Sequence, residues 1–429
     1  MSAAPDLPDA LTPAAARRAR WGVGLVFFVN GAAFASWVSR IPALRAGLHL
    51  SDGTLGSVLF ALSAGVLLSF PLVARGARLL GARRLALLCG LLSLLLLPAP
   101  FLVGIVPSLV LVMLELGMAT GGMQVSMNVL AVDVQARMGR PVISGLHGAW
   151  SAGGLAGAGL GSLAAHAGLR PAVHLAGMAA VLAAVLVFAA WLLVRVPAVP
   201  APRVVGFEAA PARHRFAGFD RVLVGLGVVC FCSFLIEGAM ADWGAVWLRE
   251  KAHASESVAA LGYAVFAGAM TGMRLVGDRV VARFGPVRPL RVLISAGTVA
   301  LAVALVLARV EATLLAFALL GLGLATVVPS AFAAGARHAD AVHAGTSDAP
   351  RARAIALMSG FGYTGLLVGP PTIGWLAQAT ELRWALGLLV ALAAVVATLV
   401  ALLGDSLRAR PASRLDPCAP KALAHPGAG

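Results

Sequence analysis

Residues 54–106 read TLGSVLFALSAGVLLSFPLVARGARLLGARRLALLCGLLSLLLLPAPFLVGIV. Two apolar runs, 54–74 and 85–106, flank a short loop with four arginines, Arg75, Arg78, Arg83 and Arg84. Each run has roughly the 20 apolar residues that a helix needs to cross a bilayer, where backbone groups must hydrogen-bond within the segment. The stretch therefore predicts two transmembrane helices joined by a basic loop.

The same alternation of apolar run and polar gap continues along the chain. The 429 residues are 60% hydrophobic and 12% charged, with a mean hydropathy of +0.92, which excludes an ordinary soluble domain. Twelve spans are predicted, at 20–42, 54–74, 85–106, 108–132, 143–166, 171–195, 221–248, 256–275, 288–308, 311–335, 352–377 and 381–404. The fold class predicted is an all-α membrane protein.

The basic residues fall in every second gap between these spans. Of the 33 Lys and Arg residues, 26 lie on the side of the membrane that holds both chain ends. The positive-inside rule then predicts that both termini are cytoplasmic, in a multi-pass protein of the bacterial inner membrane. The net charge of +15 is attributed to this topology and to contact with anionic lipid, and binding of nucleic acid is not expected.

Other classes of function find little support in the motifs. The four cysteines are scattered and predict neither a disulfide framework nor a zinc site. No Gly-rich loop ending in Lys-Ser or Lys-Thr follows a strand, so ATP hydrolysis is not expected. No cleaved signal peptide is expected either, because the apolar run after Arg20 is too long. We expect no cofactor, no metal and no enzymatic activity.

A Pro- and Arg-rich stretch at 197–220 divides the spans into two groups of six. Short motifs recur about 200 residues apart, as in Asn30-Gly31-Ala32 and Glu237-Gly238-Ala239, which is typical of transporters built from parallel repeats. We predict two six-helix bundles related by a pseudo-twofold axis. The expected organisation is a cytoplasmic tail 1–19, a first bundle 20–196, a linker 197–220, a second bundle 221–404 and a cytoplasmic tail 405–429.

These features resemble a known family. The loop Gly81-Ala82-Arg83-Arg84, its partner Gly277-Asp278-Arg279 and the six-plus-six layout are similar to the major facilitator superfamily. A narrower likeness, to the fucose-permease-related branch that includes rhizopine-type transporters, is carried by Met127-Asn128, residues 144–151 (SGLHGAWS), residues 237–243 (EGAMADW) and Gly362-Tyr363-Thr364-Gly365. The resemblance implies a monomeric, mostly proton-coupled carrier with a central cavity.

The chain also departs from the superfamily pattern. Arg78 and Ala282 stand where the two repeated loops usually carry Asp. The glycine run of the fifth span contains no proline, so the signature of drug antiporters is incomplete. This departure favours uptake of a solute over drug efflux.

Five ionisable residues inside spans are candidates for function, because such groups are costly in a membrane: Glu115, Asp133, His147, Glu237 and Asp242. Glu237 lies well inside the seventh span and is predicted to carry the coupling proton, since apolar surroundings disfavour the charged carboxylate. Asp242 and His147 are further candidates for proton transfer. The alternative for Glu237 is a hydrogen bond that only fastens two helices.

Candidate gating residues lie near the ends of the spans. Arg40 and Asp242 are predicted to lie at similar depth on repeat-related spans, and we predict that they pair as an outer gate; snorkelling of both side chains to the interface is the alternative. An inner gate or a structural latch is predicted for Asp133, which lies beside Arg137 and Arg140 and close in topology to Arg83 and Arg84; Asp278 is a further candidate.

Polar and aromatic side chains at helical spacing predict a solute-binding wall. Asn30, Phe34 and Trp37 share one face of the first span, and Gln124 and Asn128 share a face of the fourth. Amide, imidazole and aromatic groups together suit a polyhydroxylated solute. The complete set of predicted solute-facing residues is Asn30, Phe34, Trp37, Gln124, Asn128, His147, Trp150, Trp243 and Tyr363. Helix–helix adhesion is the alternative role for each alone.

The sequence therefore predicts a secondary active transporter that moves a small polar solute, sugar-like or cyclitol-like, by alternating access with proton symport. The expected partners are the solute, protons and membrane lipid. A proton-coupled drug or metabolite exporter of the same fold is the first alternative. A polytopic sensor or membrane enzyme is the second, although no catalytic cluster and no large soluble domain supports it.

Overall fold

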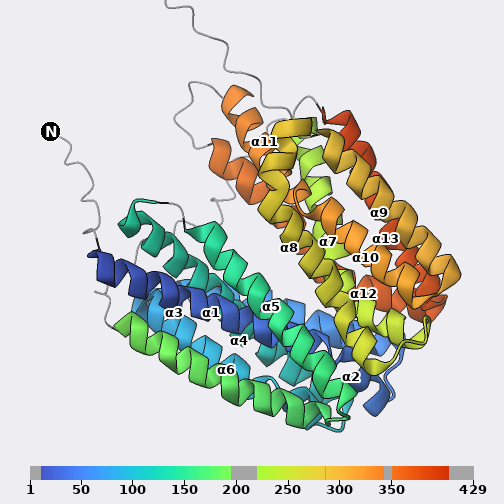
Figure 1. Ribbon diagram of the computed structural model, residues 1–429, viewed down its shortest axis with the longest axis horizontal. Helices are drawn as coiled ribbons and strands as arrows, with labels where there is room; N and C mark the ends of the chain where they lie inside the picture. The colour runs from blue at the N-terminus through green and yellow to red at the C-terminus, as the bar shows by residue number, and fades with distance from the viewer. Residues whose placement is uncertain (1–10, 141, 195–219, 286, 343–349, 405–429) are drawn as a thin grey trace, which may run out of the picture.

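The computed structural model describes residues 11–404 apart from 141, 195–219, 286 and 343–349. Nearly all of the described residues are helical, and none is in a strand (Figure 1). The first half contains α1 (Pro13–Val38), α2 (Ile41–Gly47), α3 (Asp52–Leu96), α4 (Val106–Met138), α5 (Ile143–His166) and α6 (Pro171–Val194), with a short 3-10 turn at Ala99–Phe101. The second half contains α7 (Arg221–Glu250), α8 (Glu256–Phe284), α9 (Val287–Leu307), α10 (Val310–Leu324), α11 (Val327–Val342), α12 (Pro350–Ala379) and α13 (Leu382–Leu402).

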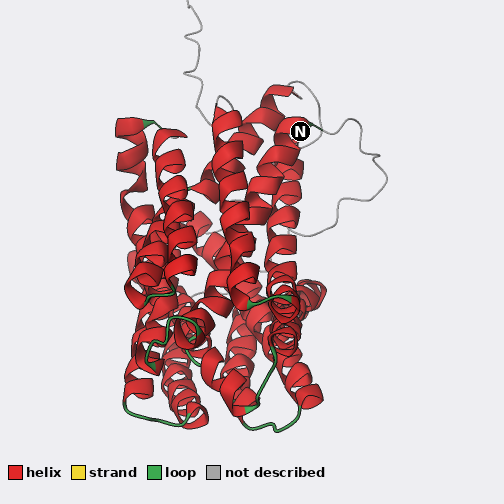
Figure 2. Cartoon of the chain, turned by 90° about the vertical axis from the view of Figure 1, so that its right-hand side faces the viewer, coloured by secondary structure: helices red, strands yellow, loops and turns green. Residues whose placement is uncertain are grey.

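The predicted all-α membrane fold is confirmed. Most helices run along one common direction, as a membrane-spanning bundle requires (Figure 2). Among the described residues, nine segments are long and apolar enough to cross a membrane. One of these segments, Asp52–Phe101, covers two predicted spans. Helices α5 and α12 lie at predicted spans but are not among the nine segments. The count of twelve therefore stays a prediction. The predicted linker and both predicted tails fall largely outside the described residues.

Helix α3 is a hairpin rather than one straight rod. Gly81 has φ 77° and ψ 150°, which a residue with a side chain rarely adopts. An ideal Cβ on Gly76 would lie 3.1 Å from Cδ2 of Leu85. In a straight helix these residues would be about 13.5 Å apart along the axis. The chain therefore reverses at Gly81, inside the basic loop that separates the two predicted spans.

Corresponding helix pairs in the two halves pack through glycine. In the first half, a Cβ on Gly153 of α5 would collide with the carbonyl oxygen of Phe28 on α1. In the second half, a Cβ on Gly365 of α12 would collide with the carbonyl oxygen of Phe231 on α7. Small residues let helix backbones approach closely in membranes, where burial of apolar surface gives no driving force between helices. The two halves therefore use the same kind of close helix packing through glycine.

This packing gives a stability prediction with a control on the same helix. Gly153→Ala is expected to destabilise the protein by about 1–3 kcal/mol, because backbone atoms of α1 cannot move aside as a flexible side chain would. Gly159→Ala should have little effect, since nothing lies within 4 Å of a Cβ at Gly159. Thermal unfolding of both variants in detergent tests this, and equal midpoints would contradict it.

The two halves meet mainly along two helix pairs, α3 with α12 and α5 with α8. A Cβ on Gly56 of α3 would lie 2.8 Å from the carbonyl oxygen of Pro370 on α12. The Ser162 hydroxyl on α5 donates to the carbonyl oxygen of Ser257 on α8 at 2.9 Å. These contacts gather at the end that carries α2, and the helices of the two halves diverge toward the end where α1 begins (Figure 1).

Candidate functional site

A cavity of about 260 Å³ lies between the two halves. This volume is close to the lower end of the roughly 300–1,000 Å³ typical of small-molecule sites, and the lining is mostly apolar with a few polar groups. Helices α1, α3, α4 and α5 supply one wall, and α7, α8 and α12 supply the other. The polar and aromatic lining residues are Asn30, Phe34, Trp37, Ser63, Ser93, Thr120, Gln124, Trp150, Phe234, Glu237, Asp242, Tyr263 and Tyr363.

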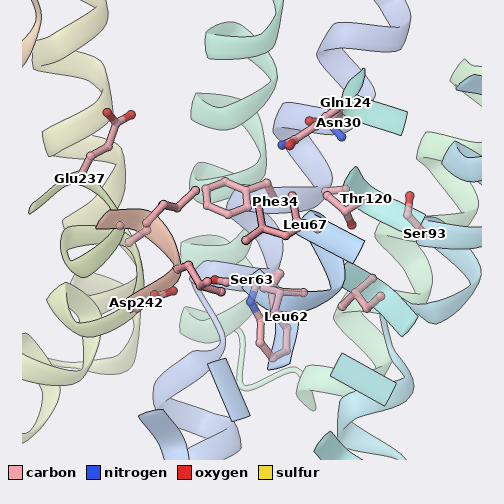
Figure 3. A pocket seen from close by; sticks show the side chains of 18 of the residues that line it. Asn30, Phe34, Leu62, Ser63, Leu67, Ser93, Thr120, Gln124, Glu237 and Asp242 are labelled. Atoms are coloured by element: carbon pink, nitrogen blue, oxygen red, sulfur yellow. The ribbon is translucent and has the colours of Figure 1, made fainter. Parts of the chain in front are cut away.

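Helical periodicity explains which side chains reach the cavity. On α1 the lining residues Asn30, Phe34 and Trp37 recur at helical spacing. On α7 the stripe 234–242 contributes Phe234, Glu237 and Asp242, so both acids lie on one broad face. Figure 3 shows Glu237 and Asp242 on one side of the cavity and Asn30, Phe34 and Gln124 on the other.

The two carboxylates are half-buried, and neither has a hydrogen-bond or salt-bridge partner in the part of the chain that the structure describes. Burying an ionisable group without a partner is costly, so proteins retain such groups in membranes mostly for function. An arrangement of this kind can take up a proton or bind a cation. It does not support the alternative in which Glu237 only fastens two helices by a hydrogen bond.

The opposite wall combines a fixed amide with aromatic rings. The indole Nε1 of Trp150 donates to Oδ1 of Asn30 at 3.0 Å, which leaves the amide hydrogens of Asn30 available. The Phe34 ring stacks on Trp150 with centroids 6.2 Å apart, and it meets Tyr263 of the second half edge-on at 5.7 Å. Directional hydrogen-bond donors beside flat apolar rings suit a small ring-shaped solute with polar substituents.

A second, smaller crevice of about 20 Å³ adjoins the cavity between α5 and α8. Glu237, Phe34, Trp150 and Tyr263 line both spaces, and Arg274 of α8 lines only the crevice. The volume is enough for one water molecule. Arg274 acts electrostatically on Glu237, and its Nε donates to the carbonyl oxygen of Ala325 at 3.3 Å.

The α2 end of the cavity is closed by charged side chains from both halves. Arg40, whose side chain is fully buried, donates from Nη1 to Oε1 of Glu256 at 2.7 Å and from Nε to Nδ1 of His174 at 3.2 Å. Nearby, Arg45 pairs with Glu250 of the second half at 3.0 Å and with Asp52 at 2.7 Å. The predicted Arg40–Asp242 pair is therefore wrong, because Arg40 is directed to Glu256 at the start of α8.

Three predicted solute-facing residues do not line the cavity. Trp243 is fully buried within the second half, and its indole nitrogen has no partner among the described residues. His147 packs edge-on against Phe27, with ring centroids 5.1 Å apart. Asn128 is exposed one turn beyond Gln124, and its amide donates to the Gln124 carbonyl oxygen at 2.8 Å. Each sits on a helix that reaches the cavity through other residues.

The predicted inner gate or latch is represented by one ion pair among the described residues. Asp133 pairs with its neighbour Arg137 on the same helix at 3.8 Å, and no ion pair joins it to Arg83 or Arg84. Arg83 donates to the carbonyl oxygen of Leu193 at 2.8 Å, and Arg84 is exposed. The side chain of Asp278 lies outside the described residues.

Several residues of the site were not predicted from the sequence: Ser63, Ser93, Thr120, Phe234 and Tyr263 line the cavity, Arg274 lines the crevice and Glu256 pairs with Arg40. Tyr263 is one of only two tyrosines in the chain, and both line the cavity. That rarity is the one signal that could have marked it. Arg274 was counted only as a loop charge, and Glu256 only as the first residue of a span. Glu115 is exposed on α4 and does not line the cavity.

A central cavity between two helical halves, closed at one end by contacts between them, is the architecture of a secondary transporter. Comparisons with known proteins agree. The Major Facilitator Superfamily profile matches residues 23–349. An uncharacterized MFS-type transporter of Yersinia pestis is 33% identical over 374 residues, covering 87% of this chain and 92% of that protein. Membrane protein MosC of Rhizobium meliloti is 29% identical over 382 residues, covering 87% of this chain and 88% of that protein.

The fold is also found among solved structures. A D-xylose-proton symporter superposes with a TM-score of 0.67 at 16% identity, over 90% of this chain and 96% of that one. The chain belongs to the major facilitator superfamily, whose members are transporters and not enzymes. The predicted superfamily is thereby confirmed.

Proposed function

We propose that the protein is a proton-coupled symporter for a small polar solute, sugar-like or cyclitol-like, in the bacterial inner membrane. The observation that carries the proposal is a pair of carboxylates, Glu237 and Asp242, without a hydrogen-bond or salt-bridge partner among the described residues, in a cavity whose far wall presents amides and aromatic rings. The resemblance to the fucose-permease-related branch and the likeness in fold to a D-xylose-proton symporter add support.

Glu237 is the proposed proton carrier, because it lies where the cavity and the crevice meet. In its protonated form it can donate a hydrogen bond to a solute hydroxyl. After the proton leaves, the nearby guanidinium of Arg274 offsets the negative charge. One water in the crevice offers a route for the proton away from the solute.

The proposed orientation places both termini in the cytoplasm, following the distribution of Lys and Arg. The end closed by Arg40 and Glu256 then faces outward, and the structure corresponds to an inward-facing state. Rocking of the halves about the cavity would break these contacts and expose the site to the outside. Monomeric function is proposed from the superfamily alone.

The exporter alternative predicts a cavity rich in Met and Phe. The lining contains Phe34 and Phe234, but no Met among its described residues. Helices α1, α3 and α4 line the cavity instead with amide and hydroxyl side chains, such as Asn30, Ser63 and Gln124. This composition favours a polar solute over a lipophilic drug.

The proposal is tested by two amides one turn apart on α4. Gln124 lines the cavity and Asn128 does not. A thermal-shift screen against sugars, cyclitols and amphipathic drugs identifies a ligand, and its Kd is then measured for Gln124→Ala and Asn128→Ala. We expect Gln124→Ala to weaken binding about tenfold, the equivalent of one lost hydrogen bond of about 1.4 kcal/mol. Asn128→Ala is expected to stay within about twofold. Equal effects, or a preference for lipophilic drugs, would contradict the proposed site.

A further inference from the structure

The charges of the cavity are distributed unequally between its two walls. The wall from α1, α3, α4 and α5 presents only neutral polar groups, such as Asn30 and Gln124. The wall from α7 presents Glu237 and Asp242. None of the described residues that line the cavity is basic. A solute held here therefore meets hydrogen-bond donors and acceptors on one side and negative charge on the other.

The two acids differ in what can balance their charge. Glu237 also lines the crevice that contains Arg274, so a positive group of the protein is close to it. Asp242 lines only the main cavity, and no basic side chain in the described part of the chain acts on it. An anion at this depth needs a counter-charge, because water cannot fully solvate it. For Asp242 that charge must come from a proton or from a bound cation.

The surroundings of Asp242 suit an ammonium group. Ser63 of α3 lines the same cavity and offers a hydroxyl oxygen as an additional acceptor (Figure 3). Tyr263 is close enough to interact electrostatically with Asp242, and Phe234 lines the same wall. An ammonium gains from a carboxylate, a hydroxyl oxygen and the faces of aromatic rings. A bare metal cation is held by several oxygen ligands at once, which a single carboxylate and a few hydroxyls do not supply.

We propose that Asp242 forms a subsite for a protonated amine on the transported solute, while Glu237 carries the coupling proton. This inference rests on the proposed function, since it requires the cavity to be the solute site. It assigns different tasks to two carboxylates on one helix: Asp242 recognises the solute, and Glu237 couples its transport to protons.

The test uses amines paired with neutral analogues of similar shape. The purified full-length protein is titrated with glucosamine and glucose, N-methylglucamine and sorbitol, and cyclohexylamine and cyclohexanol, at pH 7. Binding is followed by thermal shift and by intrinsic tryptophan fluorescence. We expect at least one amine to bind tenfold or more tightly than its neutral partner. In Asp242→Asn that ratio is expected to fall to about one, with binding of the neutral partner unchanged. Glu237→Gln is expected to keep the preference for the amine.

Several outcomes would overturn the inference. One is that the unmodified protein shows no preference for any amine, which includes the case in which no amine binds. Another is that the preference for an amine survives in Asp242→Asn. Thermal stabilisation of the protein by sodium chloride alone, if it is lost in Asp242→Asn, would identify a sodium site and would also overturn the inference. Glu115→Gln, which removes an exposed acid on α4 outside the cavity, is the matched control and should leave the preference for the amine unchanged.

Failure of this inference is distinguishable from failure of the proposed function. If Gln124→Ala weakens both members of a pair equally and the amine is not preferred, the cavity remains the solute site and only the amine subsite is refuted. If Gln124→Ala affects neither member of a pair that binds, the cavity is not the solute site and the proposed function fails.

Discussion

Replacement of Glu237 by glutamine is expected to abolish solute-driven proton movement while solute exchange continues. Glutamine resembles the protonated acid in shape and hydrogen bonding but cannot release a proton. A transporter with this change can still bind the solute and rock between its two states. It should therefore catalyse counterflow in proteoliposomes, where no net proton movement is needed. Accumulation driven by a proton gradient should fall to the level of protein-free liposomes.

The measurement is the change of external pH when solute is added to proteoliposomes, followed with an impermeant dye. The control is Glu115→Gln, which neutralises an exposed acid on α4 that lies outside the cavity. That variant should move protons as the unmodified protein does. Persistence of proton movement in Glu237→Gln would assign coupling to another group, with Asp242 as the next candidate. Loss of counterflow as well would mean that Glu237 is needed for binding of the solute itself.

Reversal of charge at Arg40 is the second change expected to have a large effect. Arg40 is fully buried and bridges the halves through Glu256 at 2.7 Å. A buried charge left without a partner costs about 3–5 kcal/mol, and Arg40→Glu places an unpaired carboxylate at a fully buried position beside Glu256. A change of that size shifts the balance between two conformations by about 100-fold or more. Arg40→Glu should therefore open the α2 end and stop transport.

The closed state can be followed by crosslinking across the halves. In a background without the native cysteines, Ser162→Cys and Ser257→Cys are expected to be joined efficiently by a short bifunctional thiol reagent, since these residues are in contact. Arg40→Glu should lower the yield strongly, and Glu256→Arg in the same chain should restore it. Glu256→Gln, a milder change at a partly exposed side chain, should lower the yield to a smaller extent.

The same experiment separates the observed pair from the one predicted by sequence. Combining Arg40→Glu with Asp242→Arg should not restore the crosslink, because Asp242 faces the cavity and does not pair with Arg40. Rescue by Asp242→Arg, or lack of rescue by Glu256→Arg, would contradict the assignment of the outer gate to Arg40 and Glu256.

The error over Arg40 has a simple geometric origin. Depth along a helix can be read from sequence, and it correctly placed Arg40 near the end of the first span. The direction in which a side chain points relative to other helices depends on how those helices are tilted and rotated. Asp242 lies on the stripe of α7 that faces the cavity, whereas Glu256 is brought to Arg40 by the turn between α7 and α8.

The same limit explains the mixed outcome for the predicted solute wall. The spacing of Asn30, Phe34 and Trp37 predicted a shared face, and all three line the cavity. On α5, His147 and Trp150 are also at helical spacing, yet only Trp150 lines the cavity, and His147 packs on Phe27. Periodicity defines a face of a helix, but a wide face can contact several neighbours at once.

The sequence by itself determined the fold class and the position of most helices along the chain, and it predicts the division into two six-helix bundles. These follow from local physics, since a backbone in lipid must satisfy its hydrogen bonds within helices and basic loops resist translocation. The tertiary structure alone decided which charges pair at the α2 end, that Tyr263 and Arg274 join the site, and that Asp242 has no basic neighbour among the described residues. Those relations depend on the packing of helices distant in sequence, which a pattern along one helix does not contain.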